Sequence, residues 1–379
     1  MAKLAHGALY IGLMSGTSID AVDAVLIQIS DRISIVDSHS IPIPQPLKDT
    51  ILGLCSSGDN EIQRAFQLDR ELGLLFADAV LELCTKANTS PNKISAIGSH
   101  GQTIRHSPHG KSAFTLQIAD PNTIAESTGI TTVADFRRRD IAAGGQGAPL
   151  VPAFHEDIFR DTNNNRAIVN IGGMANITLV AMSDIPTLGF DTGPGNVLLD
   201  YWIYKQKNQA FDHDGEWAAS GNIDTTLLAS LLSEPYLNLP PPKSTGRELF
   251  NSDWLEHKLL NFSHLSSADV QATLTELTCQ TITDAITMCD SQLGASDSVN
   301  EVFICGGGAK NSYMMQRIQT RLPNKKVSTT EVLGIAPDLV ESVAFAWLAY
   351  RTINKLSGNL TSVTGAREQR VLGAIYCGN

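Results

Sequence analysis

The chain has 379 residues and a formal net charge of −11 at pH 7. This length predicts about two domains of ~150 residues each, with enough material for two hydrophobic cores. The acidic balance argues against a nucleic-acid-binding protein, which would present a basic face. No apolar run approaches the ~20 residues that span a bilayer, and the N-terminal apolar stretch is too short for a signal peptide, so we expect no membrane partner.

The six cysteines indicate the compartment in which the protein works. They are scattered without CxxC pairs, in segments that resemble helix or strand interiors: Cys55, Cys84, Cys279, Cys289, Cys305 and Cys377. Such spacing is typical of buried thiols in a reducing compartment. We therefore expect a cytoplasmic protein.

The first segment predicts three strands, over residues 8–15, 21–30 and 34–41, because apolar residues alternate along it. The first two would form a β-hairpin whose tip contains Gly, Thr and Ser. Backbone N–H groups and hydroxyls at such a tip can bind phosphate oxygens, while Asp20 and Asp23 can hold a divalent cation directly or through water. From this segment alone, an ordinary Gly-Ser turn with solvated acids is an equally good interpretation.

The elements that follow predict an α/β protein. Helical patterns alternate with short strands, and a proline begins the last helix of this group. We expect helices over residues 46–54, 61–87 and 121–127, and strands over residues 94–99, 114–118 and 131–134.

The opening pattern occurs a second time in residues 166–181, RAIVNIGGMANITLVA. It again predicts a strand, a small-residue turn at Gly172 and Gly173, and a returning strand. Two such hairpins about half a chain apart indicate an internal repeat, with two related domains facing a cleft. The alternative is that any two hairpins with glycine turns look alike.

A third motif, GFDTGPGN over residues 189–196, precedes a predicted helix over residues 197–207. A strand end, a Gly-Pro-Gly turn and a helix N-terminus would place Asp191 beside backbone donors, where an anion binds. This is a suitable position for a general base. For an isolated Asp-Thr-Gly, a structural role in capping the turn is the simpler interpretation.

A fourth motif, EVFICGGGAKN over residues 301–311, predicts a buried strand that ends in three glycines before a helix. Glycine allows the backbone to approach a flat ligand or a phosphate closely. The same triplet would also suit a tight strand-to-helix turn without a ligand.

Other nucleotide and metal motifs are excluded. Residues 110–112 lack the earlier glycine of a P-loop, and the glycines at 306–308 lack the third glycine of a dinucleotide fingerprint. His106 and His109 have no third ligand nearby, which argues against a zinc site.

The motifs together resemble those of the 1,6-anhydro-N-acetylmuramic acid kinases, a family of the sugar kinase, actin and heat-shock ATPase superfamily. The resemblance covers nearly the whole chain, in order: GLMSGTSIDAVD, SHGQTIRH, ADFRRRDIAAGGQGAPLVP, NIGGMANIT, FDTGPGN, ICGGGAKN and the helical PDLVESVAFAWLA. The chain departs from the family at Ala21, where glycine is usual. We expect an ordinary β conformation there, which would make the change harmless.

The resemblance implies a fold and an activity. The fold would be a two-domain actin-like ATPase (ribonuclease H-like) fold of class α/β, with duplicated β-hairpin/α cores around a central cleft. Domain I would span residues 1–160 and domain II residues 161–363, with residues 364–379 packing back on domain I. ATP and Mg²⁺ would serve to open the anhydro ring with water and to phosphorylate O6. Asp191 would activate the water, and the enzyme would be a homodimer.

The resemblance also implies which residues contact the nucleotide and the metal. Asp20, with Asp23 as its partner, would hold Mg²⁺. The expected nucleotide contacts lie at the glycine-rich strand ends: Gly16, Thr17, Ser18, Ile19, Asp20, Ala21, Val22, Asp23, Gly172, Gly173, Asn176, Gly193, Gly195, Gly306, Gly307, Gly308 and Asn311.

The sugar carries a lactyl carboxylate, which an arginine fork binds through two parallel hydrogen bonds. We assign this role to Arg139, with Asp140 beside it, and keep Arg137 and Arg138 as substitutes, although a triple arginine is often only a solvated run. Lesser candidates for sugar contacts are His100, Gln102 and Glu341, and Glu341 could equally cap its helix.

A second hypothesis is an ATP-dependent scaffold or filament-forming protein of the same superfamily, without a sugar substrate. Fold analogy alone does not separate the two hypotheses. The segment 134–152 favours the kinase, because a filament protein would not need a substrate loop.

Overall fold

The computed structural model describes residues 7–16, 18–108, 110–182, 185–293 and 297–379. The chain divides into two compact units, which we describe separately. Unit 1 comprises Met1–Phe154 and Leu339–Asn379, and unit 2 comprises His155–Asp338. The sequence placed residues 339–363 in the second domain, whereas the structure places them in unit 1.

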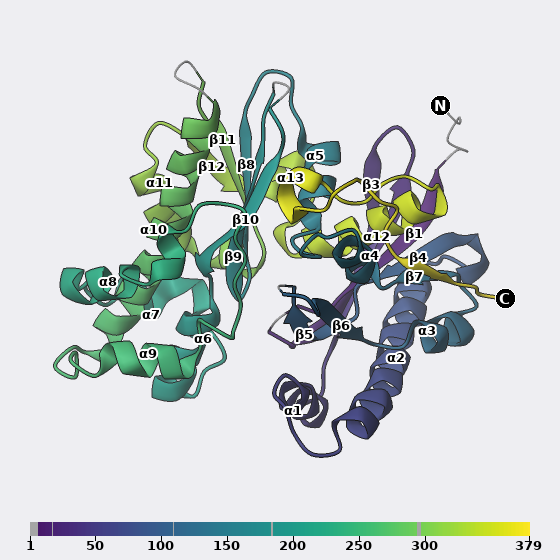
Figure 1. Cartoon of the computed structure of the whole chain (residues 1–379), viewed down its shortest axis with the longest axis horizontal. Helices are drawn as coiled ribbons and strands as arrows, with labels where there is room; N and C mark the ends of the chain where they lie inside the picture. The colour runs from purple at the N-terminus through teal and green to yellow at the C-terminus, as the bar shows by residue number, and fades with distance from the viewer. Residues whose placement is uncertain (1–6, 17, 109, 183–184, 294–296) are drawn as a thin grey trace. The chain divides into compact units, whose positions relative to one another are not determined.

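Unit 1 is built on a six-stranded sheet of order β13-β7-β4-β1-β2-β3. β1, β2 and β3 form an antiparallel meander, β4 runs parallel to β1, and β7 runs parallel to β4. The yellow C-terminal segment in Figure 1 adds β13 beside β7. The bounds are β1 Ala8–Met14, β2 Ala21–Ile29, β3 Ile33–Pro42, β4 Ile94–Ser99, β7 Thr132–Ala134 and β13 Ala374–Tyr376.

The alternation along β1 decides which helix covers each face of this sheet. Ile11 and Leu13 join a buried apolar cluster with the long helix α2 (Glu61–Lys86) (Figure 1). On the other face, a Cβ at Gly12 would overlap the carbonyl oxygen of Ser342 in α12 (Val340–Ile353). Glycine therefore lets the α12 backbone lie directly on β1, which makes α12 part of unit 1.

The remaining elements of unit 1 are shorter. The hairpin of β5 (Gln102–Ser107) and β6 (Phe114–Ile118) forms a separate two-stranded sheet. The other helices are α1 Gln45–Leu54, α3 Pro121–Thr128, α4 Phe136–Ala142 and α13 Thr361–Thr364, and α5 Val151–Phe159 spans the division between the units. The predicted helices and strands of this half of the chain are confirmed to within a few residues, whereas β5, α4, α5 and α13 were not predicted.

Unit 2 is built on a five-stranded sheet of order β10-β9-β8-β11-β12. Its strands are β8 Arg166–Ile171, β9 Met174–Val180, β10 Leu188–Pro194, β11 Glu301–Cys305 and β12 Lys326–Thr329. Its helices are α6 Val197–Lys207, α7 Glu216–Ala219, α8 Thr225–Leu232, α9 Ser252–Leu259, α10 Ser267–Leu293 and α11 Ser312–Arg321. Its core is an apolar cluster that joins this sheet to α6, α8, α10 and α11.

The two sheets repeat one topology. In each, three antiparallel strands are followed by two parallel ones, in the orders β3-β2-β1-β4-β7 and β10-β9-β8-β11-β12. The predicted internal repeat is therefore confirmed, including the tight turn at Gly172 and Gly173. The prediction for Asp191 needs a correction, because Asp191 lies inside β10, which continues through an irregularity to Pro194.

Two further findings concern the helices and the cysteines. None of the helices among the described residues is long and apolar enough to cross a membrane. All six cysteines are free thiols, and four of them are buried.

Candidate functional site

The tip of the first hairpin is a compact turn. The amide of Ile19 donates to the carbonyl oxygen of Gly16 at 3.2 Å. Ile19 has φ 56° although its side chain is buried, and this left-handed conformation costs a β-branched residue about 1–3 kcal/mol. The packing of the Ile19 side chain therefore fixes the tip, with Ser18 exposed. Thr17 lies outside the described residues.

The two acids of this hairpin have different surroundings. Asp20 is exposed, and its Oδ1 lies 2.5 Å from Lys48 Nζ. Asp23 lies in β2 and accepts a hydrogen bond from Ser40 Oγ at 2.8 Å. Among the described residues, no group of three or more His, Cys, Asp or Glu side chains is arranged to hold a metal ion. Mg²⁺ commonly takes one or two carboxylates together with substrate phosphates and water, and the exposed Asp20 fits that role.

The departure at position 21 has the expected outcome. Ala21 begins β2 and pairs with Pro42 of β3, so its backbone is ordinary β structure. The next residue, Val22, is fully buried in the core of unit 1. Only the backbone of Val22 can therefore face a ligand.

Buried hydrogen bonds connect the first hairpin to the start of β5. Ser15 Oγ donates to Gln102 Oε1 at 2.7 Å, and the amide of His100 donates to the carbonyl oxygen of Leu13 at 3.0 Å. Gln102 and His100 are both buried. The predicted substrate residues His100 and Gln102 therefore lie directly behind the hairpin tip.

His100 is bound by an arginine. Arg137 donates to His100 Nε2 from Nε at 3.1 Å and from Nη2 at 2.9 Å, and its Nη1 donates to the carbonyl oxygen of Gly147 at 2.9 Å. Burial and the charge of Arg137 hold the pKa of His100 well below its usual value. His100 is thus a neutral imidazole that accepts at Nε2, and it orients the Arg137 guanidinium.

Glu341 belongs to the same group of side chains. It lies in the first turn of α12, where Leu339 occupies the N-cap position and makes no side-chain cap. Burial raises the pKa of Glu341, the charge of Arg137 lowers it, and the charge of Asp23 raises it. The charges of Arg137 and Asp23 therefore both act on Glu341, and the capping role is not observed.

The structure separates the two residues that the sequence placed at the sugar carboxylate. Arg139 is exposed on α4, whereas Asp140 is fully buried. Asp140 accepts from the Gly147 amide at 2.8 Å, from Asn359 Nδ2 at 2.6 Å and from Thr364 Oγ1 at 2.8 Å. These bonds anchor the C-terminal segment, so Asp140 has a structural role, and Arg137 is the arginine that lies with Glu341 and His100.

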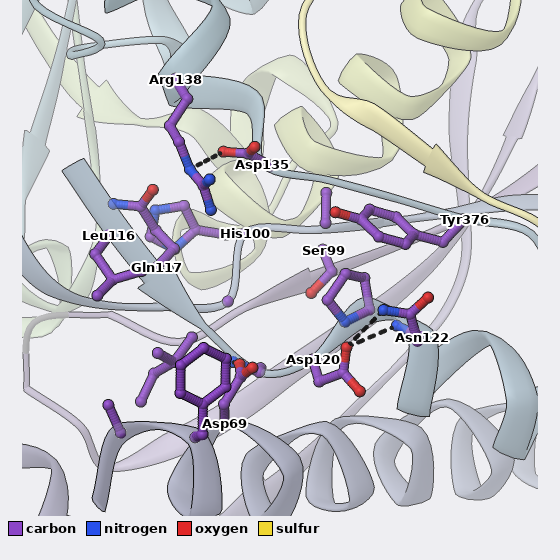
Figure 2. Close-up of a pocket in the computed structure, with 17 residues that line it drawn as sticks. Asp69, Ser99, His100, Leu116, Gln117, Asp120, Asn122, Asp135, Arg138 and Tyr376 are labelled. Carbon is purple, nitrogen blue, oxygen red and sulfur yellow. Dashed lines mark hydrogen bonds and ion pairs between the residues drawn. The ribbon is translucent and has the colours of Figure 1, made fainter. Parts of the chain in front are cut away.

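A pocket of about 320 Å³ lies on another side of His100 (Figure 2). Its acids are Asp69, Asp120 and Asp135, and Arg138 binds Asp135 at 2.9 Å. Asp120 is engaged as the N-cap of α3. Of the predicted site residues that the structure describes, His100 and the substitute arginine Arg138 line this pocket, whereas Arg137, Gln102 and Glu341 do not.

In unit 2, three glycine-rich strand ends meet. β8 and β11 are parallel neighbours, so their carboxyl ends lie at one edge of the sheet. The amide of Gly195 donates to the carbonyl oxygen of Gly173 at 2.9 Å, and the amide of Asn196 donates to that of Gly172 at 2.8 Å. Gly306 has φ 77°, where a side chain would also collide with Asn170. We call these strand ends, residues 172–173, 193–196 and 306–308, the glycine cradle.

Two predicted asparagines adjoin this cradle. Asn176 of β9 pairs with Asn170 of β8 on one side and with Asp191 of β10 on the other. Asn311 has a structural role, because its Oδ1 accepts from the Met314 amide at 2.9 Å and caps α11. Gly307 begins the short helix Gly307–Lys310, which leads from the cradle to Asn311.

Asp191 is held by a segment that the sequence reasoning missed. Its amide donates to the carbonyl oxygen of Lys243 at 3.1 Å, and its Oδ2 accepts from the Thr245 amide at 3.0 Å. Tyr236 Oη donates to the Asp191 carbonyl oxygen at 2.9 Å. Asp191 makes none of the cap bonds of α6, whose N-cap is Asn196. The run PPPKSTGRE over residues 240–248 is distinctive for its prolines and its lone lysine. Nothing in the sequence, however, connected this segment to Asp191.

The repeated sheet defines the class of protein as the two-domain fold of actin-like ATPases and sugar kinases. Among solved structures, component A of (R)-2-hydroxyglutaryl-CoA dehydratase from Acidaminococcus fermentans is similar, with a TM-score of 0.50 and 12% identity, covering 92% of this chain and 100% of that one. At this identity the likeness concerns the fold alone.

The particular family follows from closer relatives. A family model described as anhydro-N-acetylmuramic acid kinase matches residues 8–378. Proteins of that name from Shewanella halifaxensis and Coxiella burnetii are each 52% identical, over 98% and 97% of this chain and 99% and 97% of their own. The chain belongs to the anhydro-N-acetylmuramic acid kinase family. These relatives support the kinase hypothesis and not the scaffold alternative.

Proposed function

We propose that this protein uses ATP to convert 1,6-anhydro-N-acetylmuramic acid and water into N-acetylmuramate 6-phosphate and ADP. Water attacks the anomeric carbon, the bridge bond from that carbon to O6 breaks, and O6 takes the γ-phosphoryl group. The proposal rests on membership of the family over residues 8–378. One structural observation supports it above the others, namely the fixed carboxylate of Asp191 next to the glycine cradle.

Asp191 is the general base of the proposed reaction. The Thr245 amide donates to Oδ2, which helps to orient the carboxylate that would accept the proton of the attacking water. Phosphoryl transfer itself needs little covalent chemistry from the protein, so the remaining task is positioning and neutralisation of charge. The glycine cradle suits the nucleotide, because a backbone without side chains can approach a flat base or a phosphate closely.

The first hairpin tip is proposed to bind the phosphates. Backbone amides and the Ser18 hydroxyl are donors of the kind that phosphate oxygens accept. Asp20 would hold Mg²⁺, with Asp23 acting through water, and the metal would neutralise charge on the phosphates. The ion pair between Asp20 and Lys48 would have to open or rearrange for this, since it occupies Oδ1 of Asp20.

Arg137, in place of Arg139, is proposed to bind the lactyl carboxylate of the sugar. Its guanidinium is oriented by His100 and Gly147, and a planar fork can bind a carboxylate through two parallel bonds. Glu341 lies with it and would accept a sugar hydroxyl or the N-acetyl amide.

We also propose a cytoplasmic homodimer. The free thiols support a reducing compartment, and the resemblance to the family supports the dimer. Light scattering coupled to size-exclusion chromatography would measure the mass, and a monomer at micromolar concentration would contradict the dimer.

The activity is tested by incubating the purified protein with ATP, Mg²⁺ and 1,6-anhydro-N-acetylmuramic acid, followed by mass spectrometry. The expected product has gained one water and one phosphoryl group, and ADP forms in equal amount. N-acetylglucosamine, which lacks the anhydro bridge and the lactyl group, is the control and should give no product. Release of ADP that does not depend on the anhydro sugar would contradict the proposal.

A further inference from the structure

The pocket of unit 1 lies where ligands commonly bind in an α/β protein. Ser99 and Ala134, the last residues of the parallel strands β4 and β7, line it together with residues of α2 and the start of α3 (Figure 2). Crevices at the carboxyl ends of parallel strands are the usual binding sites of open α/β sheets. A volume of about 320 Å³ is at the lower end of the range for ligand pockets, so we expect a small ligand.

Ser99 gives this pocket a buried polar group without a partner. Alternation along β4 places Ser99 on the same face of the sheet as Ile97, which packs in the apolar cluster with α2. The Ser99 side chain is fully buried, and its Oγ has no hydrogen-bond partner among the described residues. Figure 2 shows Ser99 among the side chains that line the pocket. A buried hydroxyl without a partner is unfavourable, and a bound ligand would provide one.

Asp69 of α2 brings an unneutralised charge to the same pocket. Its Oδ1 accepts from the Ala119 amide at 2.8 Å, and it makes no ion pair with any residue that the structure describes. Burial raises the pKa of Asp69, the Ala119 amide lowers it, and the charge of Asp120 raises it. A positively charged ligand would therefore stabilise the ionised carboxylate of Asp69.

The other charged groups of the pocket are already engaged. Asp120 accepts from the amides of Asn122 and Thr123 as the N-cap of α3, and Asp135 pairs with Arg138 at 2.9 Å. Three carboxylates face one guanidinium in the lining, which leaves an excess of negative charge. This balance favours a cation and disfavours an anion.

Phe66 indicates that the cation is organic. It lies one turn before Arg70 on α2, lines the pocket and is 72% exposed, with Ala65 and Leu116 also in the lining. An ammonium is attracted to an aromatic face, and apolar side chains gain from covering a carbon skeleton.

We propose that this pocket binds a small organic molecule that carries a primary ammonium group. The ammonium donates to the Asp69 carboxylate and to Ser99 Oγ, and the carbon skeleton lies against Phe66. A primary ammonium has three donors, which is enough for both oxygens and one water. The proposal is independent of the proposed reaction, because none of these three residues has a role in it.

The test compares two probes, cyclohexylamine and cyclohexanol, by NMR titration of the natural protein near pH 7 without ATP or sugar. The probes share one ring, and only the amine is charged at this pH. We expect saturable binding of cyclohexylamine and an affinity for cyclohexanol that is lower by about tenfold or more, since hydrogen bonds between charged groups are the stronger ones. Equal affinities, or no saturable binding of cyclohexylamine, would overturn the proposal.

Three variants locate the binding site. Asp69→Asn keeps an acceptor for the Ala119 amide but removes the charge, so it should bind cyclohexylamine about tenfold more weakly or worse. Phe66→Ala should lose about threefold. Asp78→Asn is the matched control, because Asp78 lies on the same helix, is exposed and does not line the pocket. Its affinity should stay within about twofold of the natural value.

The outcomes decide between this pocket and another site. If Asp69→Asn, folded by circular dichroism, binds cyclohexylamine as the natural protein does, the amine binds elsewhere and the proposal fails. Should Asp69→Asn not fold, Phe66→Ala decides, because an exposed side chain can be shortened without loss of the fold, and unchanged affinity there would likewise overturn the proposal. Failure in either case leaves the proposed kinase reaction untouched.

Discussion

The two units repeat one sheet but differ in what the third strand of each meander does. In unit 1, β3 contributes Ser40, whose hydroxyl only supports Asp23 of the neighbouring strand. In unit 2, β10 contains Asp191 itself, and residues of the segment 236–245 hold it. The same ladder thus supports different chemistry, because loops between the strands can change without disturbing the sheet.

The tips of the two hairpins also differ, in whether they present side chains or backbone. The first tip is long enough to present side chains, with Ser18 and Asp20 exposed. The second is a two-residue turn whose carbonyl oxygens are bonded to the amides of residues 195–197. In the proposed function, unit 1 therefore offers side chains for phosphate, metal and sugar, and unit 2 offers a backbone cradle and a base.

Asp191→Asn should give the largest effect. We expect turnover to fall at least 10²-fold, as is typical for the loss of a general base, with nucleotide binding largely intact. Steady-state kinetics and ATP binding by calorimetry would measure the two quantities. Turnover near the natural level would show that Asp191 is not the general base, and β10 would then have a structural role like that of β3.

Arg137→Lys should affect binding of the sugar more than the chemical step. A lysine cannot make the paired bonds of a guanidinium, so we expect kcat/KM for the sugar to fall by about 10- to 100-fold, mainly through KM. Arg139→Lys, two residues further along α4, should remain within about twofold because that side chain is exposed. Equal losses in the two variants would contradict the assignment of Arg137.

Gly12→Ala should destabilise unit 1. Its Cβ would overlap the Ser342 carbonyl oxygen, and separating α12 from β1 should cost about 1–3 kcal/mol of unfolding free energy. Gly16→Ala, in the same motif, is the control, because its Cβ would meet nothing closer than Ser18 Oγ at 4.0 Å. Urea unfolding measures both. An undiminished stability in Gly12→Ala would show that α12 is not seated on β1 as described.

Glu341→Gln should give the smallest effect, and it depends on pH. Burial raises the pKa of Glu341 in the folded protein, so its favourable contribution is present below the unfolded value near 4.5 and is lost as pH rises through the folded pKa. The unfolding free energy of Glu341→Gln should therefore increase relative to that of the natural protein as the pH rises from 4.5 to 7.5. We expect a gain below about 1 kcal/mol, since the side chain is partly exposed. If the unfolding free energy of the variant instead fell relative to that of the natural protein over this range, the pKa of Glu341 would be lowered and not raised by folding.

The sequence by itself determined the repeat and the positions of its turns. Alternation of apolar residues and clusters of glycine are local signals, so the hairpins of residues 8–30 and 166–181 could be predicted without knowledge of their neighbours. The expectation of β structure at Ala21 was correct for the same reason. The motif around Asp191 likewise singled out that residue as the candidate base, although not the strand that contains it.

Only the tertiary structure decided which side chains meet. Arg137 and Arg139 lie two residues apart on α4, which places them on nearly opposite sides of a helix with 3.6 residues per turn, and only packing selects the side that faces His100. The Asp140 carboxylate accepts hydrogen bonds from Asn359 and Thr364, which are more than 200 residues away in sequence. Asp191 likewise accepts hydrogen bonds from Tyr236 and Thr245. Contacts between residues so distant in sequence leave no periodic trace in a single chain, because they depend on how separate elements pack.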